Sequence, residues 1–270
     1  MREAAYRQFE ALERSHFWFR ARRRIFLALL DRFFPARAQS RVLEVGCGTG
    51  GFLQPLQRYG DVDGLEISLD CAKRSRVARG CKIVNGNAER LPFADDTYDL
   101  VCLFDVLEHT KDDLRAMIEV GRVLKPGGVA FFSVPAYQFL FANNDRVAEH
   151  QRRYTRTALR ATIESAGLVI EKSSYFNTFL FPIILPIVLA RKCVEGIRGF
   201  DPGDRTNLDF PVPTFIGDML YRVMALEAVV LTRHSFPVGH SLVAIVSRPP
   251  TVSAERISPS GTQQADDDSH

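Results

Sequence analysis

The chain has 270 residues, of which 46% are hydrophobic, and this is enough for one large domain with or without a smaller cap. Its formal net charge of +3 is too small to indicate a nucleic-acid partner. Five cysteines, an odd number without a C-x-x-C pair, argue against a disulfide framework and a structural zinc site, so a cytoplasmic protein is expected.

Residues 1–40 are rich in arginine, show no apolar signal core, and are expected to form one or two basic amphipathic helices that end before Pro35. Apolar side chains repeat there at helical spacing, namely Trp18, Ile25, Phe26, Leu29, Leu30 and Phe33. Two interpretations remain open. In the favoured one, the segment packs on a sheet with its arginines in solvent. In the other, it forms a flap over a cofactor or an anchor on anionic lipid, and the two are compatible.

The stretch Arg41–Gly50, with the sequence RVLEVGCGTG, is the most informative part of the chain. Its β-branched run predicts a buried strand, and Gly46, Gly48 and Gly50 predict a tight turn that lets backbone approach a ligand closely. Glu44 places a carboxylate where a phosphate would be repelled and an ammonium group favoured. This pattern indicates S-adenosyl-L-methionine, although Gly46, Gly48 and Gly51 also satisfy the G-x-G-x-x-G spacing of dinucleotide sites.

From Arg41 onward the sequence alternates strand and helix patterns, which predicts a mainly parallel sheet covered on both faces. Strands are expected at 41–45, 61–66, 81–85, 98–103, 128–134, 168–175 and 241–247. Ligands of such sheets bind at the carboxyl ends of the strands. Glu66 ends the second expected strand, where an acid binds ribose hydroxyls in either cofactor class.

Residues 176–240 separate the last two expected strands and contain two apolar blocks, 176–190 and 215–231. Pro182, Pro186 and the short length of the first block argue against a membrane span. Three interpretations compete: a helical cap that packs on the sheet, a wall of an apolar substrate pocket, and a segment that dips into a membrane interface. The first two are favoured together.

Three further motifs follow the glycine turn in order, at Gly86–Phe93, Tyr98–His109 and Leu124–Gly128. With the turn, they resemble the class I S-adenosylmethionine-dependent methyltransferases, in the small-molecule branch of types 11 and 12. The resemblance implies an α/β fold, with a Rossmann-like, doubly wound sheet of seven strands that is mainly parallel and has an antiparallel last strand. The expected organisation is a flap at 1–40, a core at 41–175 and 241–248, a helical cap at 176–240 inserted before the last strand, and a disordered tail at 249–270.

The resemblance also implies that S-adenosyl-L-methionine is the cofactor, and it assigns contacts by position. The expected contacts are Glu44, Gly46, Cys47, Gly48, Gly50, Glu66, Ile67, Asn87, Ala88, Phe104 and Asp105. Asn87 departs from the family pattern, which most often has Asp there, but an amide oxygen can still accept a hydrogen bond from the adenine amino group. One arginine among Arg20–Arg24 is expected to pair with the cofactor carboxylate.

A hydroxyl acceptor needs a base, and His150 is the first candidate, on the loop that faces the cofactor methyl in this fold. The stretch 145–155 resembles a subgroup pattern in which an Asp and a His precede Arg-Arg-Tyr-Thr. Asp145 and Tyr137 complete the expected catalytic set. The opposing interpretation is a helix lead-in with Thr155 as the N-cap.

The other histidines that were weighed, His109 and His16, are expected to have structural roles. No metal is expected, because Glu149 and Asp145 are not joined by a clear third ligand.

These expectations describe an S-adenosylmethionine-dependent methyltransferase that acts on a small molecule. The favoured acceptor is a hydroxyl on an apolar or lipid-linked substrate, with nitrogen and carbon acceptors left open. The alternative is a catalytically inactive, cofactor-binding partner subunit of a methyltransferase or biosynthetic complex, and a dehydrogenase ranks third. Peripheral membrane contact is a further expectation, while the acceptor and the oligomeric state are not set by the sequence.

Overall fold

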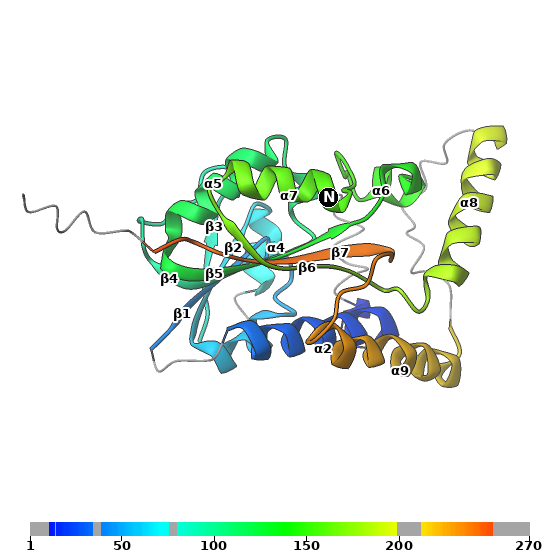
Figure 1. The fold of residues 1–270 in the computed structure, drawn as a ribbon, viewed down its shortest axis with the longest axis horizontal. Helices are drawn as coiled ribbons and strands as arrows, with labels where there is room; N and C mark the ends of the chain where they lie inside the picture. Colours follow the sequence, from blue (N-terminus) through cyan, green and yellow to red (C-terminus); the bar gives the residue numbers. More distant parts are fainter. Residues whose placement is uncertain (1–10, 14, 35–38, 76–79, 199–211, 251–270) are drawn as a thin grey trace, which may run out of the picture.

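A seven-stranded sheet runs through the computed structural model, which describes residues 11–13, 15–34, 39–75, 80–198 and 212–250 (Figure 1). Its strands are β1 Arg41–Val45, β2 Asp61–Glu66, β3 Lys82–Asn85, β4 Tyr98–Phe104, β5 Leu124–Pro135, β6 Val169–Phe176 and β7 Ser241–Ser247, in the order β3-β2-β1-β4-β5-β7-β6. The first five strands pair in parallel, and β7 inserts antiparallel between β5 and β6. The predicted sheet with its antiparallel last strand is confirmed.

The strand bounds follow the sequence pattern closely except at the start of β5. This strand begins at Leu124, whereas the pattern placed its start at 128. Pro126 and Gly127 read as a turn, yet here they lie inside the strand. Gly127 has φ 75°, and the pairing with β4 shifts register between Tyr98 and Leu100, so an irregular segment extends the strand.

Two apolar layers cover the sheet because successive strand residues point to opposite faces. Leu43, Val101 and Phe132 belong to one buried cluster, with residues of helices α5 (Asp113–Val123) and α7 (Arg156–Ser165). The alternate positions Val42 and Phe131 belong to the other, with residues of helices α2 (Phe17–Phe33), α3 (Leu53–Leu56) and α9 (Thr214–Leu231). The sheet is therefore covered on both faces, as a doubly wound fold requires.

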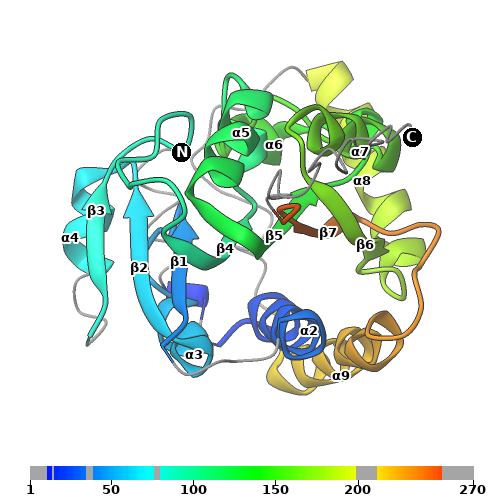
Figure 2. The same cartoon turned by 60° about the vertical axis from the view of Figure 1, so that its left-hand side comes forward.

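Helices α5 and α7 lie on one face of the sheet, and α2, α3 and α9 lie on the other (Figure 2). The described helices are α2 Phe17–Phe33, α3 Leu53–Leu56, α4 Leu69–Ser75, α5 Asp113–Val123, α6 Asn143–Val147, α7 Arg156–Ser165, α8 Phe181–Arg198 and α9 Thr214–Leu231, with 3-10 turns η1 Gln57–Tyr59, η2 Leu107–His109 and η3 Gln138–Leu140. Helix α7 begins at the predicted N-cap, because the Thr155 side chain accepts a hydrogen bond from the Ala158 N–H.

Helix α2 packs on the sheet, as the first interpretation of the N-terminal segment predicted. That interpretation was wrong to place all the arginines in solvent, because Arg22 is buried. Its fully buried residues include Ile25, Phe26 and Leu29, which share a cluster with β1 and β4. The helix begins at His16, whose Nδ1 accepts a hydrogen bond from the Trp18 N–H at 3.3 Å. The part of the predicted N-terminal helices before residue 11, and Pro35, lie outside the described residues, as does the predicted tail from 251 onward.

Helix α9, from the second apolar block, lies beside α2 on the same face of the sheet (Figures 1 and 2). Met224, Ala228 and Leu231 are buried there. Arg20 of α2 bonds to Asp218 of α9 at 2.9 Å. The second block therefore packs as the predicted cap, and it forms one layer with the N-terminal helix.

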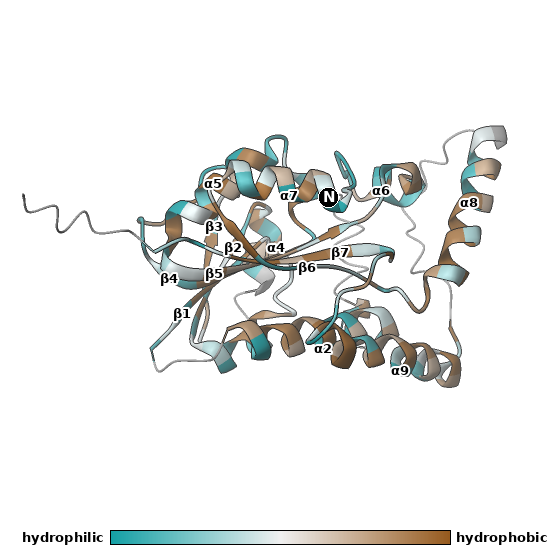
Figure 3. Ribbon diagram, in the orientation of Figure 1, coloured by the Kyte–Doolittle hydropathy of each residue, from teal (hydrophilic) through white to brown (hydrophobic). Residues whose placement is uncertain are grey.

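Helix α8, from the first apolar block, projects at the edge of the molecule near α6 instead of covering the sheet (Figure 1). Its polar side chains bind the segment after β5: Lys192 donates to the Phe139 carbonyl, and Arg146 pairs with Glu195. Ile183 and Ile187 remain 59% and 50% exposed, and brown apolar stretches line α8 in Figure 3. Over the described ranges, no helix combines the length and the apolar character that crossing a bilayer demands.

Candidate active site

The turn after β1 has a backbone that glycine adopts easily and other residues do not. Left-handed φ angles of 70°, 54° and 91° occur at Gly46, Gly48 and Gly50. A Cβ on Gly46 would lie 2.6 Å from a methyl carbon of Val106. The N–H groups of Gly46 and Cys47 donate to the Leu65 carbonyl at 2.7 and 3.0 Å, which ties the turn to β2. Bare backbone is thus presented at the carboxyl ends of β1 and β2.

Glu44 is a buried acid at this turn, and one of its carboxylate oxygens, Oε2, has no hydrogen-bond partner in the described part of the chain. Burial raises the pKa of Glu44 well above its usual range, and the neighbouring Glu13 and Glu66 carboxylates raise it further. A cation beside Oε2 would offset all three effects. The site therefore suits an ammonium group, as the sequence predicted.

Glu66 and Asn87 are both engaged with nearby backbone. The Glu66 carboxylate accepts hydrogen bonds from the N–H groups of Gly48 and Ser68 at 2.8 and 2.9 Å. The Asn87 side-chain oxygen accepts one from the Glu89 N–H at 2.9 Å. Carboxylate and amide oxygens can accept more than one hydrogen bond, so the predicted contacts with ribose and adenine are compatible with this geometry. The neighbours Ile67 and Ala88 are exposed and buried, respectively.

Phe104 and Asp105 lie at the end of β4, where the predicted methionine end of the cofactor would be. The Phe104 ring lies 4.3 Å from that of Phe52 and 5.2 Å from that of Phe26, centroid to centroid. Asp105, with φ 57°, accepts a hydrogen bond from Ser133 Oγ at 2.7 Å and pairs with Arg22 at 2.6 Å. Of the predicted arginine cluster, Arg22 therefore reaches the carboxyl edge of the sheet.

Glu13 and Thr49 are site residues that the sequence analysis missed. The Thr49 hydroxyl donates to Glu13 Oε2 at 3.0 Å, so an acid from the N-terminal segment lies on the glycine turn. A Cβ on Gly51 would collide with this carboxylate, at 1.6 Å from Oε1. The glycine at 51 therefore makes room for Glu13. No local sequence signal marks this contact, since it joins segments 36 residues apart.

His150 and Asp145, two of the predicted catalytic residues, lie in direct contact. His150 Nδ1 is 2.8 Å from Asp145 Oδ1. Arg153 donates to both oxygens of Asp145, at 2.8 and 2.9 Å, and the Ala142 N–H donates to Oδ2. Burial alone would raise the pKa of Asp145, but the hydrogen bonds from His150 and Arg153 outweigh it and lower the pKa to about 2. The carboxylate is therefore charged, and it orients the His150 ring.

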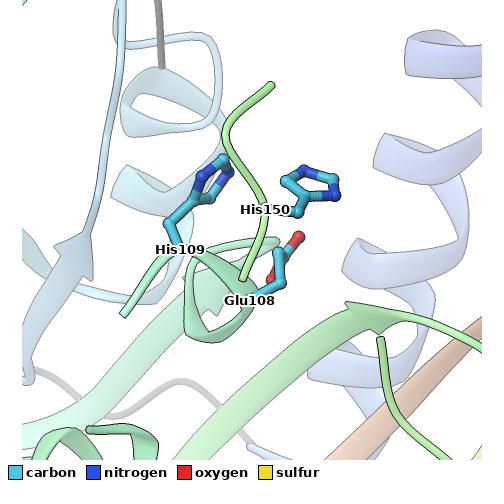
Figure 4. Close-up of side chains that lie close together, drawn as sticks. All are labelled: Glu108, His109 and His150. Carbon is cyan, nitrogen blue, oxygen red and sulfur yellow. The ribbon is translucent and has the colours of Figure 1, made fainter. Parts of the chain in front are cut away.

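His150 also lies beside Glu108 and His109 of the turn after β4 (Figure 4). The His109 and His150 rings are 4.6 Å apart and nearly perpendicular. Burial, with the nearby His150, lowers the pKa of His109 to about 3, so its ring is neutral. Burial also raises the pKa of Glu108 well above its usual range. One ligand atom from each of Glu108, His109 and His150 thus lies within 4.8 Å of the other two.

Tyr137, the third predicted catalytic residue, lies among aromatic rings. Its ring stacks on Tyr175 at 5.2 Å and on Phe181 at 5.9 Å, so it joins the end of β5 to α8.

His240 was missed by the sequence analysis. Its Nδ1 is buried without a hydrogen-bond partner among the described residues, and burial lowers the pKa of His240 to about 4. Its ring meets Trp18 edge to face at 5.9 Å.

A family model described as "Methyltransferase domain" matches residues 17–173, which is more than half of the chain. The chain belongs to this methyltransferase family. A Mycolicibacterium smegmatis protein named as a probable S-adenosylmethionine-dependent methyltransferase is 31% identical over 173 residues, which cover 61% of this chain and 64% of the relative. A demethylmenaquinone methyltransferase of Lysinibacillus sphaericus is 32% identical over 116 residues, covering 38% and 50%. The chain thus spans less than two thirds of either relative.

A solved S-adenosylmethionine-dependent methyltransferase from Mesorhizobium loti has the same fold, with a TM-score of 0.53 and 18% identity, covering 81% of this chain and 95% of that one. S-adenosyl-L-methionine is the cofactor of this methyltransferase, as predicted. The chain fits it on its own geometry, through the bare turn at Gly46 and the unpartnered oxygen of Glu44. The individual contacts assigned to the eleven positions, and the catalytic roles of His150, Asp145 and Tyr137, remain predictions.

Proposed function

We propose that this protein transfers a methyl group from S-adenosyl-L-methionine to a hydroxyl group of a small apolar acceptor. The observation that carries the proposal is the His150–Asp145 contact. Because the Asp145 carboxylate is charged, it accepts the hydrogen bond of an Nδ1–H, and this leaves the lone pair on Nε2 of His150 free. A hydroxyl acceptor loses its proton as its oxygen is methylated, and Nε2 would accept that proton.

When bound, the cofactor supplies a methyl group on a positively charged sulfur. The chain would position it through the Gly46 turn, with Glu44 facing the ammonium group and Glu66 facing the ribose. Arg22 and Asp105 neutralise each other at this edge. The acidic groups at the glycine turn are then Glu13, Glu44 and Glu66, which favour a cationic cofactor over a nucleotide pyrophosphate.

An apolar acceptor is supported by the aromatic rings after β5. Tyr137, Tyr175 and Phe181 stack together between the end of the sheet and α8. Helix α8 continues this apolar surface with Ile183 and Ile187 exposed. One relative is named for a demethylmenaquinone acceptor, which is an apolar molecule. We extend the proposal to contact between α8 and a membrane surface, where a lipid-linked acceptor would be found.

The direct test is the variant His150→Ala, compared with His234→Ala, which removes an exposed histidine at the end of α9. We expect kcat to fall by roughly 100-fold in His150→Ala, with the dissociation constant for S-adenosylhomocysteine within about two-fold of wild type. Added imidazole should restore part of the activity. A parallel loss of cofactor affinity and turnover would contradict the role of His150 as a base. Cofactor binding without turnover by the wild type on any acceptor would indicate the inactive-subunit alternative.

A further inference from the structure

Glu108, His109 and His150 each place one ligand atom within 4.8 Å of the other two (Figure 4). We propose that these three side chains form a binding site for a divalent transition-metal ion, for which Zn²⁺ is the best match. We further propose that the bound ion occupies Nε2 of His150, so that the ion-loaded and the base-competent forms exclude each other. The proposed ion-binding site does not depend on the proposed function. The mutual exclusion of bound ion and base rests on the proposed function.

The Glu108 carboxylate points to a cation. Its side chain is fully buried, and neither Oε1 nor Oε2 has a hydrogen-bond partner in the described part of the chain. A buried carboxylate with both oxygens unsatisfied is costly, and a nearby positive charge is the usual compensation. The nearby arginines pair directly with other carboxylates, Arg22 with Asp105 at 2.6 Å and Arg153 with Asp145 at 2.8 Å. The charge of Arg22 compensates Glu108 only in part, since the pKa of Glu108 stays well above its usual range. A metal ion between Glu108 and the two imidazoles would supply that charge.

The two histidines are held as metal-binding histidines are. His150 Nδ1 bonds to the Asp145 carboxylate at 2.8 Å, and His109 hydrogen-bonds to the backbone of Glu149. Such partners fix the tautomer and orientation of the ring and leave the other nitrogen for the metal. Arg153 and the Ala142 N–H hold Asp145 in turn. The cluster therefore has an ordered outer shell as well as three ligands.

The ligand set selects the class of ion. Two imidazoles and one carboxylate suit Zn²⁺, Co²⁺ or Mn²⁺, whereas Mg²⁺ and Ca²⁺ prefer oxygen ligands throughout. Ligand atoms of a tetrahedral Zn²⁺ site lie roughly 3.4 Å apart, given metal–ligand distances near 2.1 Å. Separations of up to 4.8 Å require the ligand atoms to close by up to about 1.4 Å when an ion binds, through rotation of the side chains. Three protein ligands leave one position open to water.

Occupancy of this site has a consequence for methyl transfer. Nδ1 of His150 is committed to Asp145, so Nε2 is the atom that would either bind the ion or accept the proton of the acceptor. One lone pair cannot do both. Loading with Zn²⁺ should therefore suppress methylation of a hydroxyl acceptor and leave cofactor binding in place, and a chelator should restore activity.

Binding is tested directly on the full chain by equilibrium dialysis with Zn²⁺ and by titration with Co²⁺, whose visible absorption reports a four- or five-coordinate nitrogen and oxygen site. One ion per chain is expected. The variants Glu108→Gln and His109→Asn should weaken binding by at least the roughly 10- to 100-fold that loss of an outer-shell partner costs. His234→Asn and Glu164→Gln, at exposed positions, are the matched controls.

Circular dichroism and S-adenosylhomocysteine binding show which variants are folded. The Co²⁺ spectrum of the wild type tests the site even if a variant does not fold. Absence of Zn²⁺ and Co²⁺ binding by the wild type would overturn the site. Unchanged affinity in folded Glu108→Gln and His109→Asn would overturn it as well. If turnover rises when Zn²⁺ is bound, the proposed exclusion between bound ion and base is wrong. If only the proposed function is wrong, the ion still binds and no turnover is seen with or without Zn²⁺.

Discussion

At the scale of single residues, Asp145 is the side chain that holds His150 in place. This carboxylate is fully buried and accepts hydrogen bonds from His150, Arg153 and the Ala142 N–H. The sequence predicted the Asp–His pair through its resemblance to a subgroup pattern. It did not predict the two-point contact with Arg153, because the geometry of that contact depends on how the loop after β5 folds back.

We predict that Asp145→Asn lowers kcat by about 100-fold while the affinity for S-adenosylhomocysteine stays near that of wild type. The neutral amide cannot hold the His150 ring in the tautomer that leaves Nε2 free. Steady-state kinetics at saturating cofactor measure the fall in kcat, and titration with S-adenosylhomocysteine is the control for cofactor affinity. An equal loss of affinity would show that Asp145 acts mainly on the fold of the loop.

The same side chain contributes to acid stability. The folded pKa of Asp145, about 2, lies below the usual value for an aspartate, so its contribution is present above the unfolded pKa and is lost as pH falls toward 2. Acid unfolding of Asp145→Asn should therefore depend less on pH between about 4 and 2 than that of wild type. Fluorescence-monitored titrations of both proteins compare the slopes, and identical slopes would contradict the charged state of Asp145.

Gly46 provides a second test at this scale. The variant Gly46→Ala places a Cβ 2.6 Å from Val106 in a backbone with φ 70°, so we expect a cost of about 1–3 kcal/mol and loss of cofactor binding. Gly196→Ala in α8, where nothing lies within 4 Å of the added carbon, should be neutral or slightly stabilising. Urea unfolding and cofactor titration give both results. Normal binding by Gly46→Ala would place the cofactor elsewhere.

At the scale of elements, the sheet was predictable because its strands are buried on both faces and therefore appear in the sequence as short continuous apolar runs. Val42 and Leu43 enter opposite clusters, and the same alternation recurs in β4, β5 and β7. The early start of β5 was not predictable, because Pro126 and Gly127 carry a turn signal that the pairing with β4 overrides. The packing of α9 beside α2 was also beyond the sequence, since both helices are apolar enough to pack in several ways.

Glu227 links α9 to the end of β6 and tests the importance of this layer. Its buried carboxylate accepts hydrogen bonds from the N–H groups of Asn177, Thr178 and Phe179 at 2.6, 2.7 and 2.8 Å. Glu227→Ala leaves these donors without a partner, so we expect a loss of about 3 kcal/mol in the free energy of unfolding. Glu164→Ala on the exposed side of α7 is the control, and a loss equal to that of the control would contradict the contact.

At the scale of the whole molecule, the two apolar blocks of the 176–240 segment form helices that lie in different places. Helix α9 completes a layer under the sheet, although Phe215, Met219, Leu226 and Val229 remain exposed on it. Helix α8 lies at the edge of the molecule and leaves Ile183, Ile187, Leu189 and Val194 exposed. Composition alone could not separate them, because both blocks are apolar with helical spacing. Phe181, the first residue of α8, stacks on the ring of Tyr137. This contact joins the proposed acceptor site to the helix of the proposed membrane contact.

We predict that Ile183→Asp combined with Ile187→Asp weakens binding to vesicles of anionic phospholipid by at least ten-fold, because charged residues oppose insertion of an apolar helix face. Cofactor affinity should not change. Vesicle co-sedimentation measures the effect, and Ile118→Asp, which alters an exposed position on α5, is the control. Equal binding by all three proteins would remove α8 from the membrane proposal.

The most direct test of the central claim follows the methyl group itself. Methyl-labelled S-adenosyl-L-methionine is incubated with the purified protein and fractionated extract of the source cells, with His150→Ala in parallel. We predict label in the organic phase, attached to oxygen in the product by mass spectrometry, and at least roughly 100-fold less of it with His150→Ala. Label found only in the aqueous phase, or attached to nitrogen or carbon with full activity of His150→Ala, would contradict the account.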